Sequence, residues 1–153
     1  MFLLHNPLTP GSLTGSWSTV NVRLEAAVDP SPWILVIDDD RWTREALVSI
    51  LQRAGYRVTT LERFGQELEA GHCPEPYQVA VLDYHLPDLN GLEVARRLKQ
   101  FQPDCRIVMI SSELPSLAAL ADHEAVVDRF LAKPFSKDAI LEVIAQLCPL
   151  PAK

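Results

Sequence analysis

Three aspartates, Asp38, Asp39 and Asp40, directly follow an apolar run at residues 33–37 that reads WILVI. Two like charges about 4 Å apart repel one another by about 4 kcal/mol at an effective dielectric constant near 20. An acidic cluster at the end of a buried segment therefore needs a compensating positive charge. A divalent cation such as Mg²⁺, which prefers oxygen ligands, would supply that charge.

Three further polar or charged side chains stand at the ends of later apolar runs: Asp83, Ser111 and Lys133. A hydroxyl and an ammonium group suit the oxygens of a phosphoryl group. Mg²⁺ is commonly bound by one or two carboxylates together with phosphate oxygens. One carboxylate of such a site can itself be the nucleophile and form an aspartyl phosphate. The residue types therefore predict phosphoryl chemistry.

The apolar runs that carry these residues alternate with helical patterns. Strands are predicted at residues 33–37, 56–61, 78–83, 106–111 and 126–132. Helices are predicted at residues 43–55, 90–101, 114–124 and 136–147, with a weaker pattern at 62–72 that contains a glycine. This alternation predicts βαβ units and an α/β fold, a doubly wound five-stranded parallel sheet with helices on both faces. Ligands of such sheets bind at the carboxyl ends of the strands, so the acids, the hydroxyl and the ammonium group are expected to meet at one edge.

Local signals predict where several helices begin and end. Asn90, with Glu93 three residues later, has the spacing of a capping box. Ser136 is expected to begin the last helix, and Gly55 is expected to end the first. Asp40 is interpreted as the N-cap of the first helix rather than as a metal ligand.

Composition and charge argue against several other classes of protein. The 153 residues fit one domain, and a net charge of −6 without a basic stripe disfavours direct nucleic-acid binding. The three cysteines, Cys73, Cys105 and Cys148, are odd in number and lack a CxxC spacing, which is typical of reduced structural thiols. No apolar run is long enough for a membrane span or a signal-peptide core. We therefore expect a cytoplasmic protein without a membrane anchor.

From about Trp33 to Leu147 the chain resembles the receiver domain of bacterial two-component response regulators, which has a flavodoxin-like fold. Asp38 and Asp39 match the doubled acid of that family, and Asp83, within DYHLPDLNG, matches its phosphoacceptor aspartate. The remaining matches are the hydroxyl residue Ser111, the aromatic switch position Phe130 and the Lys133-Pro134 pair. On this interpretation residues 1–32 are an arm or linker that includes one possible short strand, 33–148 are the receiver domain, and 149–153 are a tail.

The resemblance implies a metal and a reaction. Asp83 would take a phosphoryl group from a histidine kinase or a histidine phosphotransfer protein, with no activity beyond its own phosphorylation and dephosphorylation. Asp39, Asp83 and the backbone carbonyl of His85 would bind Mg²⁺ directly, and Asp38 would act largely through bound water. Lys133 would pair with the phosphoryl oxygens.

The resemblance also implies a switch. Ser111 would move its hydroxyl toward the phosphoryl group and Phe130 would follow inward, which would reshape the surface formed by residues 114–124, 126–132 and 136–147. His85 and Glu113 stand where the family tunes the lifetime of the phosphoryl group. The output partner is not predicted. Because the last helix lacks the arginines that some DNA-binding regulators use to dimerise, we expect a monomer or a weak homodimer.

Two other functions remain open at this point. A haloacid-dehalogenase-like phosphatase also uses a D-x-D motif after its first strand, a later Ser or Thr, and a Lys. Asp38 and Asp40, with Ser111 and Lys133, match that skeleton loosely, and Asp38 would then be the nucleophile. That alternative leaves Asp83 without a role. A protein-binding module that works without phosphorylation is the third possibility.

Overall fold

The computed structural model describes residues 29–65, 68, 70–113, 121 and 125–152. The chain divides into two units, residues 1–30 and 31–153, and the sheet lies in the second. The predicted helix at 114–124 and the possible strand before residue 29 lie almost entirely outside the described residues. Among the described residues, no helix is both long and apolar enough to cross a membrane.

Five parallel strands form one sheet in the order β2-β1-β3-β4-β5. The strands are β1 (Trp33–Ile37), β2 (Arg57–Leu61), β3 (Tyr77–Asp83), β4 (Arg106–Ser111) and β5 (Arg129–Ala132). This order is that of doubly wound flavodoxin-like sheets, in which the chain changes direction of winding between β1 and β3. The predicted fold class is therefore confirmed.

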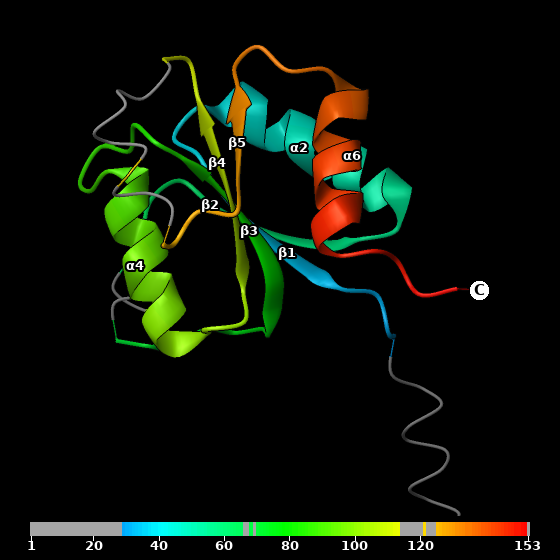
Figure 1. The fold of residues 1–153 in the computed structure, drawn as a ribbon, viewed down its shortest axis with the longest axis horizontal. Helices are drawn as coiled ribbons and strands as arrows, with labels where there is room; N and C mark the ends of the chain where they lie inside the picture. Colours follow the sequence, from blue (N-terminus) through cyan, green and yellow to red (C-terminus); the bar gives the residue numbers. More distant parts are fainter. Residues whose placement is uncertain (1–28, 66–67, 69, 114–120, 122–124, 153) are drawn as a thin grey trace, which may run out of the picture. The chain divides into compact units, whose positions relative to one another are not determined.

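Helices cover both faces of the sheet (Figure 1). They are α2 (Arg41–Ala54), α4 (Gly91–Phe101) and α6 (Lys137–Leu147). Leu35, Leu82 and Met109 contribute to the core cluster on the α4 side, whereas Val36, Val81 and Val108 contribute to the cluster on the side of α2 and α6. Successive residues of a strand point to opposite faces, so strands buried on both sides must be apolar throughout.

The predicted helix caps are confirmed. The side chain of Asp40 accepts hydrogen bonds from the backbone N–H groups at the start of α2, and Asn90 and Ser136 cap α4 and α6 in the same way. Gly55 ends α2 with φ of 110°, a left-handed conformation that glycine adopts without steric cost. The cap at Asp40 begins α2 close to the end of β1, whereas the loop of residues 84–90 separates the end of β3 from the cap-stabilised start of α4.

The fifth strand is shorter than its predicted range. The pattern predicts a strand from residue 126, but β5 begins at Arg129. The cause is Asp128, whose carboxylate Oδ2 accepts the backbone N–H of Ile107 at 2.8 Å in place of a backbone carbonyl. The partly buried Val127 packs against the core cluster on the α4 side without joining the sheet.

Candidate phosphoacceptor and metal site

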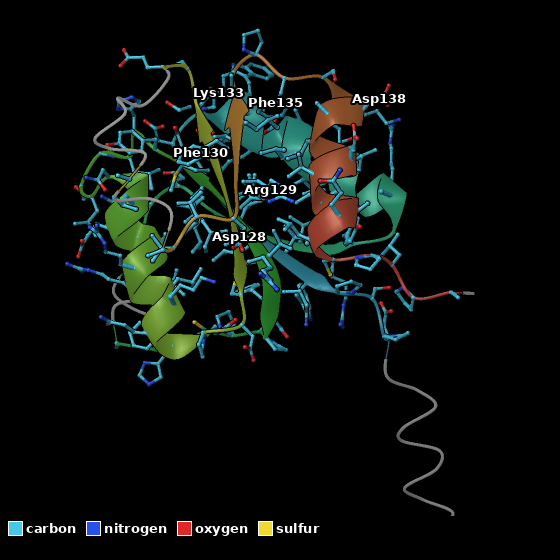
Figure 2. All side chains as sticks on the ribbon, viewed as in Figure 1. Asp128, Arg129, Phe130, Lys133, Phe135 and Asp138 are labelled. Carbon is cyan, nitrogen blue, oxygen red and sulfur yellow. The ribbon has the colours of Figure 1, made fainter. Side chains whose placement is uncertain are left out.

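Four adjacent strand ends bring the predicted side chains to one edge of the sheet. Asp38 follows β1, Asp83 ends β3, Ser111 ends β4 and Lys133 follows β5. Since β1, β3, β4 and β5 are neighbours in that order, these residues approach one another although up to 95 positions separate them in the chain. Figure 2 shows Lys133 at the carboxyl end of β5.

Lys133 joins two of the acids. Its Nζ donates to Asp38 Oδ2 at 2.8 Å and to Asp83 Oδ2 at 3.3 Å. Asp38 is completely buried and Asp83 is nearly so, whereas the Lys133 side chain is 20% exposed. The other oxygen of Asp38 accepts the backbone N–H of Asp40 at 2.8 Å. The hydrogen bonds therefore hold Asp38 on both oxygens.

The third carboxylate completes an acidic cluster. One oxygen each from Asp38, Asp39 and Asp83 lies within 4.8 Å of the others, and Asp39 is the exposed member. Three carboxylates face one ammonium group, so the cluster keeps an excess of negative charge. Oxygen-only ligands with that charge excess fit a hard divalent cation such as Mg²⁺.

The ionisation of the cluster reflects this charge balance. Burial and the negative charge of Asp38 raise the pKa of Asp83, and Lys133 only partly opposes the shift. Burial alone would lower the pKa of Lys133, but its bonds to Asp38 and Asp83 outweigh that effect and raise it. Lys133 is therefore firmly charged, while Asp83 is a carboxylate that the protein alone stabilises incompletely.

Gly91 has a steric reason to follow Asp83 in the DYHLPDLNG segment. Its N–H donates to the carbonyl oxygen of Tyr84 at 2.7 Å, so the loop folds back onto the end of β3. A Cβ at Gly91 would clash with the carbonyl oxygen of Asp83 and would lie 2.7 Å from Met109 Sδ. Only glycine permits this close approach beside the predicted acceptor.

Residues 34–145 match the family described as response regulator receiver domain. The chain belongs to this family. The response regulator receiver protein CpdR from Brucella abortus is 33% identical over 112 residues, which are 72% of this chain and 92% of CpdR. The C4-dicarboxylate transport transcriptional regulatory protein DctD from Pseudomonas aeruginosa is 34% identical over 121 residues, which are 78% of this chain and 26% of DctD.

A solved receiver structure has the same fold. The response regulator TrrA from Thermotoga maritima, in complex with Mg²⁺-BeF, matches with a TM-score of 0.66 at 28% identity, covering 76% of this chain and 98% of TrrA. The chain spans less than half the length of several of its curated relatives. It is a receiver domain of the two-component type, and these comparisons favour neither a phosphatase nor a phosphorylation-independent binding module.

Two predicted residues of the receiver domain lie on the strands beside the acidic cluster. Ser111 is buried, and its Oγ accepts the backbone N–H of Glu113 at 3.1 Å. Phe130 lies on β5 opposite Met109 and packs, partly buried, against the core cluster on the α4 side (Figure 2). Their part in a switch stays a prediction.

The side chains of the two predicted lifetime residues, His85 and Glu113, lie close to each other. His85 Nε2 lies 3.8 Å from Glu113 Oε2, so the pair joins the segment after β3 to the segment after β4. Both side chains are exposed, and the backbone N–H of His85 donates to Asp83 Oδ1 at 3.2 Å. The predicted ligation through the His85 carbonyl oxygen stays a prediction.

Sequence reasoning missed Arg44. Its Nη1 donates to the backbone carbonyl oxygen of Asp38 at 2.7 Å, and its Nη2 lies 3.2 Å from Glu62 Oε1. Its place in the first turns of the helix after the acidic run was the available signal, although the pattern also suits a solvated arginine. Trp42, in the first turn of the same helix, is 75% exposed and lines a groove of about 440 Å³ with Lys133 and Phe135.

Proposed function

We propose that this receiver domain accepts a phosphoryl group on Asp83 from the phosphohistidine of a histidine kinase or a histidine phosphotransfer protein. The observation that carries the proposal is the contact of Lys133 with Asp38 and Asp83 inside a cluster of three carboxylates. A structural ion pair would not need the third, exposed acid. A site for a cation and a phosphoryl group would use all four groups.

The chemistry follows from the side chains at the strand ends. One oxygen of Asp83 attacks the phosphorus atom, a P–O bond forms, and the P–N bond to the imidazole breaks with its electron pair leaving on nitrogen. Lys133, already 3.3 Å from Asp83, pairs with the oxygens of the transferred group. Ser111 exchanges its contact with Glu113 for a hydrogen bond that its hydroxyl donates to the phosphoryl group.

The three carboxylates are suited to hold Mg²⁺. Asp39, Asp83 and the backbone carbonyl of His85 would be direct ligands, and Asp38 would act largely through water. The bound ion supplies positive charge that offsets the charge of the phosphoryl oxygens. Without it, Lys133 alone balances three acids, which agrees with the raised pKa of Asp83, caused first by burial and then by Asp38.

The readout of phosphorylation lies on the β5 side of the molecule. The movement of Ser111 toward the phosphoryl group would draw Phe130 inward and change the surface of β5 and α6 together with residues 114–124. The pairing of His85 with Glu113 at the mouth of the site is suited to control the access of water, and with it the phosphoryl lifetime.

We also propose which partners this domain binds. A phosphohistidine donor follows from the chemistry of the site. The output partner is a protein surface or an attached domain, since the net charge of −6 offers no match for a nucleic-acid backbone. A monomer or a weak homodimer, located in the cytoplasm, remains the expectation.

Intact mass after incubation with acetyl phosphate, with and without Mg²⁺, tests the proposal. The wild type should gain one phosphoryl group only with Mg²⁺, and Asp83→Asn should gain none. Asp88→Asn is the matched control, because Asp88 is an exposed acid in the loop between β3 and α4 and should behave as wild type. Release of phosphate independent of Asp83 but dependent on Asp38 would instead support the phosphatase.

A further inference from the structure

Arg44 connects three segments that meet at the acidic cluster. It lies on α2, its side chain is 13% exposed, and its two terminal nitrogens face different partners. Nη1 donates to the carbonyl oxygen of Asp38, just after β1, and Nη2 contacts Glu62, just after β2. The planar guanidinium group can donate to both acceptors at once. A lysine ammonium at the same place lacks two donor nitrogens in this fixed arrangement.

The contact with Asp38 is the one that matters for the site. Glu62 is 73% exposed, and ion pairs with such exposed partners contribute little to stability. The hydrogen bond to the carbonyl of Asp38 is short, at 2.7 Å, and it is charge-assisted. It fixes the peptide group that joins Asp38 to Asp39.

Asp39 depends on that peptide group for its position. In the part of the chain that the structure describes, no hydrogen bond or ion pair holds the carboxylate of Asp39, whereas Lys133 and backbone N–H groups hold Asp38 and Asp83. Asp39 nevertheless presents an oxygen within 4.8 Å of the other two acids. With no such partner, the position of this oxygen depends on the backbone of Asp39 and on the side-chain rotamer that the backbone allows.

We propose that Arg44 is a positioning residue for the divalent cation, which holds the Asp38–Asp39 peptide so that Asp39 faces Asp83. This inference rests on the proposed function, because it assumes that the acidic cluster binds Mg²⁺. Arg44 is not itself a metal ligand, because its guanidinium group has hydrogen-bond donors and no acceptor. It acts through the backbone in the way that outer partners orient metal ligands.

Calorimetric titration of Mg²⁺ into the Arg44→Met variant tests the proposal. Methionine keeps an unbranched apolar side chain but lacks the guanidinium group that makes both contacts. We expect the affinity to fall roughly tenfold, the lower end for loss of an outer partner of a metal ligand. The rate of phosphorylation by acetyl phosphate should fall at low Mg²⁺ and return to that of wild type at saturating Mg²⁺, because a change that weakens only the binding of the ion leaves the rate of the saturated protein unchanged.

Two controls separate position from charge. Arg53→Met removes the same charge from an exposed position of α2, and Glu62→Gln removes the outer partner of Arg44. Both should bind Mg²⁺ as wild type does. Arg44→Lys keeps the charge and one possible donor, so its affinity should lie between those of wild type and Arg44→Met. It also provides the test if the methionine variant does not fold.

The possible outcomes distinguish a failure of the role inferred for Arg44 from a failure of the proposed function. An affinity within twofold of wild type in Arg44→Met, or in Arg44→Lys should that variant alone fold, would overturn the inference and leave the proposed function standing. An equal loss in Arg53→Met would overturn it also, because charge rather than position would then be the cause. A wild type that binds no Mg²⁺ would overturn the proposed function itself, and the inference with it.

Discussion

An ionic cluster lies at each end of β5, and the two differ in how their charges are matched (Figure 2). At the amino end, the carboxylate of Asp128 lies 3.0 Å from Arg106 Nη1 and 3.9 Å from Lys99 Nζ. It also accepts the N–H of Ile107 at 2.8 Å. Both oxygens of this single acid have partners from the protein, so the cluster needs nothing from outside.

At the carboxyl end the balance is the reverse. Lys133 contacts Asp38 and Asp83, and Asp39 lies beside them, so one ammonium group faces three carboxylates. The burial of two of these acids makes the excess charge costly. The charge of Asp128 is matched within the fold, whereas the cluster at the carboxyl end keeps an excess of negative charge that a bound divalent cation would offset.

Replacing Lys133 should have the largest effect. Lys133→Met leaves Asp38 buried without its counter-charge, and loss of one partner of a buried ion pair costs about 3–5 kcal/mol. We expect a loss of about 3 kcal/mol in the free energy of unfolding without Mg²⁺, measured by urea titration, and partial recovery with Mg²⁺. Lys137→Met, at an exposed position at the start of α6, is the control and should change stability little. A similarly small change at Lys133 would contradict the comparison.

Replacing Asp128 should have the next largest effect. Asp128→Ala removes the acceptor of the Ile107 N–H and the partner of Arg106, and an unsatisfied buried donor costs about 1–3 kcal/mol. We expect a loss of about 2 kcal/mol that is the same with and without Mg²⁺. Urea titrations under both conditions would check this, and a Mg²⁺-dependent loss would remove the distinction between the two ends of β5.

Removing one charge from the excess should stabilise the protein. Asp83→Asn keeps the shape of the side chain and relieves its repulsion with Asp38, so the Mg²⁺-free protein should gain about 1 kcal/mol of unfolding free energy. The Mg²⁺-dependent stabilisation of the wild type should disappear in the same variant. Thermal unfolding with and without Mg²⁺ measures both effects. If the variant were less stable than wild type without Mg²⁺, the protein itself would already balance the negative charge of Asp83, contrary to this prediction.

The smallest effect concerns Cys105, at the amino end of β4. Burial raises the pKa of this thiol to about 12, above its ordinary value of 9.0. The protein therefore favours the neutral thiol, and the stability that this preference contributes is present below pH 9.0 and is lost as the pH rises toward 12.

Alkylation tests this prediction in a Cys73→Ser, Cys148→Ser background, where Cys105 is the single thiol. Because the thiolate is the reactive form, iodoacetamide at pH 8 should modify the native protein at least about tenfold more slowly than the urea-unfolded protein. Equal rates would show that water reaches the amino end of the sheet.

Local patterns in the sequence determined much of this protein. The apolar runs located all five strands, because a strand buried on both faces must be apolar throughout. Seven of the ten strand ends agree with the prediction, two differ by one residue, and the start of β5 differs by three. The caps at Asp40, Asn90 and Ser136 were predictable because each bonds to backbone groups two or three residues away. The strand-end rule, together with the family motif, also placed the acidic cluster at one edge of the sheet.

Only the tertiary structure decided how those groups meet. The sequence does not reveal that Asp38 is buried and Asp39 exposed, that Lys133 bonds more closely to Asp38 than to Asp83, or that Arg44 holds the carbonyl of Asp38. The pattern likewise predicted a fifth strand three residues too long at its start, because the hydrogen bond that the Ile107 N–H donates to the Asp128 carboxylate joins residues far apart in the sequence. Hydrophobic period and capping are local properties of the chain. Contacts between residues far apart in the sequence depend on strand order and packing, which arise only when the sheet forms.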